Sequence, residues 1–461
     1  MSCFEHDQSR RAFLKRAGVL GVAGVATPFA TTLGAIGEAA AATAGDYKAL
    51  VCVFLYGGND YANTLTPYDS ASYAQYAAAR QNIALARMAL DATALNPVNS
   101  LGGRQYALAP TLSPLLPLFN AGKLAPILNV GTLVQPTTKA QYQAQSVRLP
   151  PKLFSHNDQQ SYFQASNPEG ATSGWGGRIG DLYQSGNGTS TLTCINASGN
   201  AVYLTGQSAL QYAIGTGGPI ALLNNSSTLF GSATVASNLR SLMTGSSPNM
   251  MANEHGRVAK RARDTYAQVT GALASAPAAN FNLFPTGNGL ADQLKMVARL
   301  ISVSNELGAK RQVFFVSLGG FDLHDNLVTQ QPILMQRVGD ALKAFYDTTV
   351  ALGVGDKVTT FTASDFGRTL QSNDDGSDHG WGSMHFALGG AVKGQRIYGT
   401  PPAIGSNTPD DVGQGRLIPT ISVDQYAATL ASWFGVPAGS MATVLPNIGN
   451  YNPSSWNVGF V

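Results

Sequence analysis

The chain has 461 residues, of which only 12% are charged, against about 25% in an average soluble protein. Its formal net charge of +3 at pH 7 gives no basic surface of the kind that binds nucleic acid. A chain of this length forms either two domains or one large α/β domain with insertions.

Residues 1–44 have the features of an export signal. A twin-arginine signature at 9–15 precedes a weakly apolar, Ala- and Gly-rich stretch and an A-x-A cleavage site at Ala42-Thr43-Ala44. The alternative is a membrane anchor, but Gly, Ala and Thr make the stretch too weakly hydrophobic for a bilayer span. We therefore expect the twin-arginine export machinery to deliver a mature chain of residues 45–461, with no stable membrane span, to the periplasm or the extracellular space.

Removal of this segment changes the charge very little. It takes away four of the 29 basic and three of the 26 acidic residues, which leaves 25 and 23. Cys3 is removed as well, so only Cys52 and Cys194 could pair. One disulfide is compatible with an oxidising compartment. Cys52 lies inside an apolar run, however, and this favours a buried free thiol.

Short apolar runs alternate with helical patterns along the mature chain. Four runs rich in β-branched residues predict buried strands: Ala49–Tyr56, Leu124–Val130, Gln312–Leu318 and Val358–Ala363. Four segments predict helices: about Glu254–Ser275, Leu290–Leu307, Pro332–Leu352 and Ser422–Phe434. This alternation predicts one α/β domain with a mostly parallel central sheet and helices on both faces.

A Ser-, Thr-, Asn- and Gly-rich stretch at about 186–247 interrupts this pattern. We interpret it as an insertion in the single α/β domain. Its short runs Thr191–Ile195 and Ala201–Leu204 are candidate strands of a cap or of the insertion itself.

Aspartate and histidine gather in five glycine- or serine-containing motifs: Gly57–Asp60, Ser155–Asp158, Gly319–Asp325, Ser364–Thr369 and Asp378–His385. In an open α/β sheet, ligands bind beyond the carboxyl ends of the strands. Three of the motifs directly follow predicted strands, and the last one is expected on the loop after the third. The glycine pairs at 57–58 and 319–320 permit sharp exits and close backbone approach. The sequence therefore predicts one site at this edge of the sheet.

The mixture of carboxylates and imidazoles, without thiolates, is typical of a divalent metal site, with zinc or manganese favoured over magnesium or calcium. One ion, or two sharing a bridging ligand, would be bound. The predicted ligands are Asp60, Asp322, His324, Asp365, Asp378, His379 and His385. Two alternatives stay open: Asp60 caps a turn through an Asx bond, and Asp322 and His324 form a structural hydrogen-bonded pair.

Four further residues are candidates for catalysis. Ser155-x-x-Asp158 resembles a capping box that opens a short helix over Asn157–Ala165. A helix N-terminus also stabilises an activated hydroxyl or a bound oxyanion, which makes Ser155 a candidate nucleophile. Thr64 is the weaker rival. His156 is either a ligand or a general acid, and Arg368 pairs with a structural carboxylate or binds a substrate anion.

Taken together, the motifs resemble DUF1501, a family of exported proteins without an assigned function. The resemblance rests on the twin-arginine signal, a GGND-type turn at 57–60, an SHxDxQ-type segment at 155–160, a GG(F/W)DxH segment at 319–324, and an (S/T)(D/E)FGR…DHG pattern at 364–368 and 378–380. The family is similar to the alkaline phosphatase and sulfatase superfamily, which implies an α/β sandwich with a two-metal site. By that resemblance Ser155 or Thr64 is the nucleophile, and the ligands are Asp60, Asp322, His324, Asp365, His379 and His385.

One departure from the superfamily concerns Asp365. Phe366 follows it where the superfamily often has histidine. Either His379 supplies the missing imidazole or the second metal is lost.

These features favour a periplasmic, metal-dependent hydrolase of phosphate or sulfate esters, acting on a small-molecule or polymer substrate. A metal-stabilised binding or envelope-assembly protein without turnover is the alternative, because polar loops and low charge suit contact with carbohydrate or polymer. A degenerate hydrolase relative with one structural metal is the third interpretation.

Overall fold

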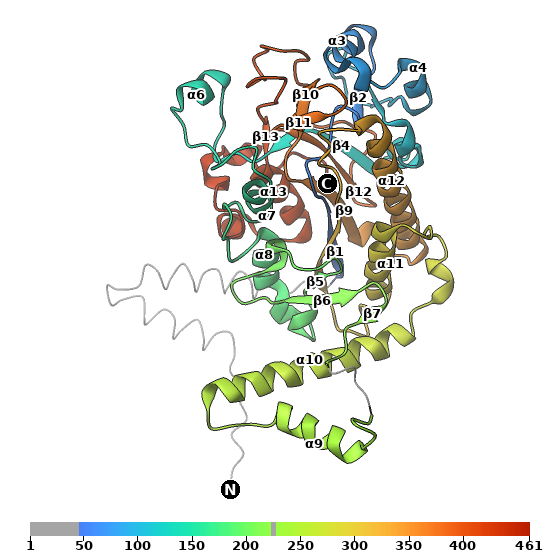
Figure 1. Cartoon of the computed structure of the whole chain (residues 1–461), viewed down its shortest axis with the longest axis vertical. Helices are drawn as coiled ribbons and strands as arrows, with labels where there is room; N and C mark the ends of the chain where they lie inside the picture. The colour runs from blue at the N-terminus through green and yellow to red at the C-terminus, as the bar shows by residue number, and fades with distance from the viewer. Residues whose placement is uncertain (1–45, 223–226) are drawn as a thin grey trace.

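A nine-stranded sheet forms the centre of the molecule (Figure 1). The computed structural model describes residues 46–222 and 227–461, so the predicted export signal lies outside the described residues. In sheet order the strands are β13 (Ile421–Ser422), β4 (Leu124–Gly131), β12 (Ser383–Gly389), β9 (Val358–Ser364), β1 (Lys48–Leu55), β8 (Arg311–Leu318), β5 (Cys194–Asn196), β6 (Gln211–Gly215) and β7 (Gly218–Pro219). β12 runs antiparallel to β4 and β9, and β7 runs antiparallel to β6. All other neighbours in this sheet are parallel.

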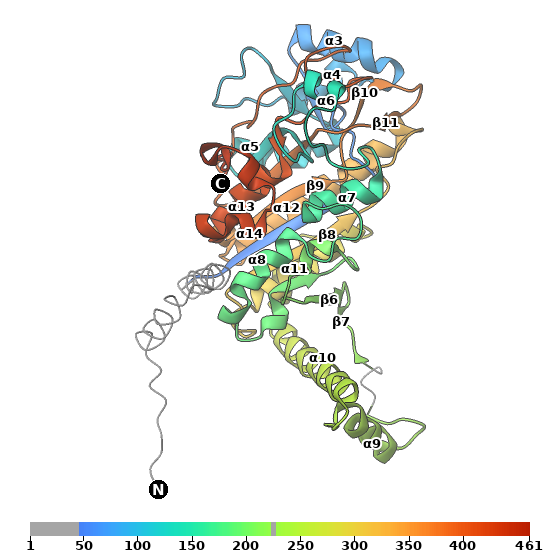
Figure 2. The ribbon, with the colours of Figure 1, turned by 90° about the vertical axis from the view of Figure 1, so that its left-hand side faces the viewer.

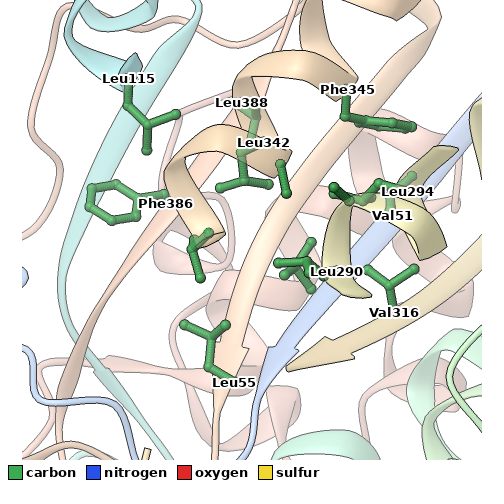
Figure 3. Packing of buried hydrophobic residues seen from close by; sticks show 14 of the residues in the cluster. Val51, Leu55, Leu115, Leu290, Leu294, Val316, Leu342, Phe345, Phe386 and Leu388 are labelled. Atoms are coloured by element: carbon green, nitrogen blue, oxygen red, sulfur yellow. The ribbon is translucent and has the colours of Figure 1, made fainter. Parts of the chain in front are cut away.

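Side chains of β1 alternate between two hydrophobic cores, as the period of a strand requires. Val51 and Val53 enter one core, which α11 (Gly289–Ser302) and α12 (Leu327–Ala351) cover. Figure 3 shows Val51 and Val316 of this core packed against Leu290 and Leu294. Cys52 and Phe54 enter the other core, which is covered by α8 (Trp175–Tyr183), α13 (Val423–Phe434) and α14 (Met441–Val444). The predicted α/β fold, with a mostly parallel sheet and helices on both faces, is therefore confirmed.

Smaller elements complete the body: α3 (Ser70–Arg80), α4 (Arg87–Leu90), α5 (Leu116–Asn120), α6 (Lys139–Ala144), α7 (His156–Ala165) and two small sheets made of β2 (Leu65–Pro67) with β3 (Tyr106–Leu108) and β10 (Arg368–Ser372) with β11 (Ser377–His379). None of the helices in the described parts of the chain is long and apolar enough to cross a bilayer. Cys52 and Cys194 are both buried free thiols.

The four predicted strands are present as β1, β4, β8 and β9, and the four predicted helices as α10 (Met250–Ala274), α11, α12 and α13. One expectation was wrong: residues 383–389 form the buried strand β12 and not a loop. Of the two short runs considered as strands, 191–195 contributes to β5, whereas Val202–Leu204 is a 3-10 helix.

The stretch predicted as an insertion, together with the helix α10 that follows it, serves two structural purposes. β5, β6 and β7 extend the central sheet beyond β8. α9 (Ala233–Thr244) and α10 then pack together and project from the body (Figures 1 and 2). The division into one domain with an insertion stays a prediction.

Candidate metal centre

The strands β1, β8 and β9 are parallel neighbours, so their carboxyl ends lie at the same edge of the sheet. The loops that follow these ends carry the predicted motifs. Gly57 allows these loops to approach closely. Its φ is +113°, and a Cβ added there would lie 2.4 Å from the backbone nitrogen of Asp322. β11 and the start of α7 approach the same place and bring His379 and His156.

Three side chains present ligand atoms to one point: His156, Asp322 and His379. The Nε2 atoms of the two histidines lie 3.0 Å apart. Asp322 Oδ1 lies 3.4 Å from His156 Nε2 and 3.3 Å from His379 Nε2. Ligands of an ion with bonds of 2.0–2.1 Å lie about 3.0 to 3.3 Å apart in octahedral or tetrahedral geometry. The spacing of the three atoms therefore fits one face of a metal coordination shell.

The second ring nitrogens explain why the Nε2 atoms are free to bind metal. His379 Nδ1 lies 2.7 Å from the carbonyl oxygen of Phe154, which can only accept, so Nδ1 carries the hydrogen. His156 Nδ1 lies 2.6 Å from Asp365 Oδ2. Two Nε2 lone pairs 3.0 Å apart repel unless a proton or a cation lies between them. The carboxylate of Asp322 in the same face favours a metal cation, and such carbonyl and carboxylate partners are typical of metal-bound histidine.

The surroundings hold Asp322 and His379, but not His156, in the protonation state that binds a cation. Partial burial acts to raise the pKa of Asp322, but the hydrogen bond and charge of Arg368, with smaller effects from His156 and His324, lower it to about 2. Burial lowers the pKa of His379, and the neighbouring cationic groups lower it further. Burial also acts to lower the pKa of His156, but Asp365 outweighs it and the net pKa is raised. At neutral pH Asp322 is thus ionised and His379 is neutral, the states that bind a metal.

His324 flanks the group on its exposed side. Its Nε2 lies 2.9 Å from His379 Nε2 and 3.2 Å from Asp322 Oδ1, and its side chain is 45% exposed. Its Nδ1 lies 3.1 Å from Asp378 Oδ1, so Asp378 orients His324 as Asp365 orients His156. Two of the four carboxylates predicted as ligands, Asp365 and Asp378, are therefore hydrogen-bond partners of the histidines.

Two other predicted ligands do not face this group. Asp60 is buried; its Oδ2 accepts from Arg80 at 2.8 Å and from the Ser377 hydroxyl at 2.7 Å, and its Oδ1 caps the backbone N–H of Asn63. His385 points from β12 into the core, where it packs against Phe163 and Tyr426. Burial lowers its pKa to about 3. These positions give Asp60 and His385 structural surroundings and do not support a ligand role.

The predicted hydroxyl nucleophiles are engaged elsewhere. Ser155 occupies the N-cap position of α7, but its hydroxyl donates to Asp158 Oδ2 at 2.9 Å and makes no capping bond to the helix backbone. Thr64 is buried and donates to the carbonyl of Asp60 at 2.7 Å.

Arg368 is an organiser of the site. It is buried, and its guanidinium donates to Asp322 Oδ1 at 2.5 Å. It also donates to four backbone carbonyls, those of Gly57, Gly58, Phe321 and Ser377. The donors of Arg368 are thus directed at the loops and at Asp322, and they hold Asp322 in place.

A family model described as "Protein of unknown function (DUF1501)" matches residues 47–436. This chain belongs to the DUF1501 family. Among solved structures, the crystal structure of the lipoteichoic acid synthase LtaP from Listeria monocytogenes is similar to this DUF1501 member, with 9% sequence identity and a TM-score of 0.33 over 87% of this chain and 76% of that chain. No curated protein matches the sequence.

Sequence reasoning missed three parts of the site. Gln160 donates to Asp365 Oδ2 at 2.8 Å and lies one helical turn after His156, a spacing that the sequence does show. The ring of Phe366 packs against the rings of both His156 and His379, with centroids 4.8 Å away in each case. The carbonyl of Phe154 has no sequence signal, because every residue carries one.

Proposed function

We propose that this DUF1501 protein is a metal-dependent hydrolase of phosphate or sulfate esters, with zinc or manganese held by His156, Asp322 and His379. The observation that carries the proposal is the three-atom face with an open side. Structural zinc sites are closed by four protein ligands, whereas catalytic sites keep a position for water or substrate. Here the side chain of Asp322 is 48% exposed and that of His324 is 45% exposed, so the face is open to solvent.

A bound divalent ion would polarise the ester oxygen and lower the pKa of a water molecule at the open position. Since Ser155 and Thr64 hold other partners, we propose water as the nucleophile. His324, oriented by Asp378 and directed at the same face, is the proton donor or acceptor for this water or for the leaving group.

Arg416 takes the anion-binding role that was predicted for Arg368. It donates from Nε to the backbone carbonyl of His379 at 2.7 Å and lies over the ring of Phe154. Its side chain is partly exposed. Burial acts to raise the pKa of Asp378, but hydrogen bonds from Asn373 and His324, with a smaller effect from the charge of Arg416, lower it. A cation in this place would attract the phosphate or sulfate group of the substrate.

The test is metal analysis and turnover of the mature protein, purified after export without chelator. We expect one equivalent of zinc or manganese, and hydrolysis of p-nitrophenyl phosphate or p-nitrophenyl sulfate. Asp322→Ala should lose the metal and at least 100-fold in kcat/KM. Asp325→Ala removes an exposed carboxylate from the same loop and should change neither. A folded wild-type protein without metal, or an Asp322→Ala variant with full turnover, would contradict the proposal.

A metal-stabilised binding protein without turnover is the second candidate. The occupied hydroxyls of Ser155 and Thr64 favour it, because the centre then has no side-chain nucleophile. It predicts a full equivalent of metal in the purified protein and no hydrolysis of either ester class.

A further inference from the structure

The arm made by residues 227–274 is separate from the candidate metal centre. Figure 2 shows it leaving the body below β6 and β7, and α9 lies farther from the body than α10 in both views (Figures 1 and 2). Gly188, in the loop beside the middle of α10, donates to the carbonyl of Gly308 just before β8 begins. The arm therefore adjoins the amino end of β8, whereas the metal centre lies beyond its carboxyl end.

Exposed apolar side chains are concentrated on and beside this arm. Nine of the fifteen exposed large apolar residues in the described parts of the chain lie within 210–258. The most exposed are Phe230 at 93%, Leu242 at 81%, Met250 at 80% and Met251 at 75%. Val235 and Leu242 are seven residues apart on α9 and so share one face of the outermost helix. Exposure of this density marks an interaction surface.

The charge of the arm has one predominant sign. No Asp or Glu occurs between Asp181 and Glu254. The arm contains Arg240, Arg257, Lys260, Arg261 and Arg263, against Glu254 and Asp264 as its only acidic residues. The rest of the mature chain is nearly neutral, so the cations of the arm give it a distinct positive potential.

A polar cleft of about 520 Å³ lies where α10 meets the body. Arg257, Lys260 and Arg261 line it on the helix side together with Asp264, which pairs with Lys260 at 2.5 Å, and Thr189, Ser190 and Thr191 line it on the body side. The cations still outnumber the carboxylate in this lining by three to one. Cationic and hydroxyl groups on facing walls suit the phosphate of a lipid headgroup. Exposed apolar side chains next to such a cleft suit the acyl region of the same lipids.

We propose that the arm docks on an anionic phospholipid surface. Apolar side chains of the acid-free helix α9 and of the start of α10 enter the headgroup boundary, while the cations of α10 attract the anionic headgroups. A second copy of the chain fits less well, because a symmetric contact between two arms brings their cations together. The proposal does not depend on the activity of the metal centre.

The experiment is flotation of the mature full chain with vesicles made of equal parts phosphatidylglycerol and phosphatidylcholine, and with phosphatidylcholine vesicles alone. We expect binding to the anionic vesicles, weaker binding at high salt, and at least tenfold weaker binding to phosphatidylcholine. The double variants Phe230→Ser/Leu242→Ser and Arg257→Gln/Arg261→Gln should each lose at least tenfold in vesicle binding. Met88→Ser is the matched control, since Met88 is 86% exposed on α4, away from the arm.

Circular dichroism checks that every variant is folded. No flotation of the wild-type chain, or equal flotation of the arm variants and the Met88→Ser control, would overturn the proposal. Sedimentation equilibrium supplies the competing result: a wild-type dimer that Phe230→Ser/Leu242→Ser dissociates, without vesicle binding, would assign the surface to a second copy of the chain.

Discussion

Four aspartates near the candidate centre have different neighbours, and these neighbours decide what each can do. Asp60 faces the buried cation of Arg80. Asp365 and Asp378 accept from imidazole nitrogens. Asp322 is bound by Arg368 on one side and faces two histidine Nε2 atoms on the other, so it is the one in the three-atom face. The same type of side chain therefore serves as a core ion-pair partner, a histidine partner or a candidate ligand, according to its contacts.

Replacing Asp365 with asparagine tests the role of a histidine partner. Asp365 Oδ2 accepts from both His156 Nδ1 and Gln160 Nε2, and an amide of the same size removes the negative charge that holds this arrangement. We expect metal affinity to fall about 10- to 100-fold, the usual effect of losing such a partner. Competition with a chelator of known affinity measures it. Asp374→Asn, on the exposed hairpin between β10 and β11, should bind as the wild type does. Equal affinity in the two variants would mean that Asp365 does not support the centre.

His385 gives a pH-dependent prediction. Burial lowers its pKa to about 3 from the usual 6.5. Between these pH values the unfolded chain binds a proton that the folded chain does not, so the stability due to neutral His385 is complete above pH 6.5 and falls as pH drops towards 3. In His385→Gln this loss is absent. The free energy of unfolding of the variant, relative to that of the wild type, should therefore rise by about 1.4 kcal/mol for each pH unit below 6.5. Urea denaturation at pH 7, 6 and 5 measures the slope.

The control for this slope is His255→Gln, because His255 is exposed on α10. Its free energy of unfolding should follow the wild type at all three pH values. A His385→Gln variant that runs parallel to the wild type, or that loses bound metal, would return His385 to the list of candidate ligands.

Among the individual residues, the sequence shows which side chains are candidates but not which of them meet. Arg80 and Ser377, which engage Asp60, come from α3 and β11 and have no distinguishing pattern of their own. His156 and His379 were recognised as members of motifs, yet their 3.0 Å approach depends on the placement of α7 against β11. Contacts between distant segments depend on tertiary packing, which the spacing of residues within one segment does not predict.

At the scale of elements, glycines at strand ends determine how closely the loops approach. Gly57→Ala places a Cβ 2.4 Å from the backbone nitrogen of Asp322 at a φ of +113°. The backbone must move to relieve this contact, at a cost of about 1 to 3 kcal/mol, and the segment that moves is the adjacent loop that carries Asp322. We expect this variant to lose stability and to bind metal at least tenfold more weakly.

Gly102→Ala is the control for Gly57→Ala, because it introduces backbone strain without moving a neighbouring loop. Gly102 also has a positive φ, +65°, but a Cβ there meets nothing within 4 Å. It should lose about 1 kcal/mol of stability through backbone strain and keep its metal affinity. If the two variants lose metal affinity equally, or if Gly57→Ala keeps it, the close approach of the loops is not what positions Asp322.

The elements that the sequence predicts are those with an uninterrupted local pattern. β1, β4, β8 and β9 are runs rich in apolar and β-branched residues, and Ser422 caps the predicted helix α13 through a capping box with Gln425. β12 has no such local signal, because His385 interrupts its apolar run and belongs to one of the motifs that carry aspartate and histidine. α12 begins at Leu327, five residues before the predicted start at Pro332, because proline lies inside this helix and does not open it.

At the scale of the whole molecule, the candidate centre joins α7, the loop after β8 and β11, whose residues are spread from 156 to 379. Parallel pairing explains why the loops after β1, β8 and β9 meet, and this was predictable. The arrival of α7 from outside the sheet was not. A metal bound to residues from three segments would link them in the folded state, and no such site exists in the unfolded chain.

Metal binding should therefore stabilise the whole fold. A free metal concentration 100 times the dissociation constant adds about 2.7 kcal/mol to the free energy of unfolding. We expect chelator-treated wild-type protein to gain a few degrees in Tm when zinc or manganese is restored, measured by calorimetry. Asp322→Ala should show no gain, because it lacks one of the three ligand atoms. Phe230→Ser/Leu242→Ser should gain as much as the wild type, since the arm lies away from the centre. An equal gain in Tm in Asp322→Ala would show that the metal stabilises the chain from another site. No gain in Tm in the wild type would show that the candidate centre does not bind these metals.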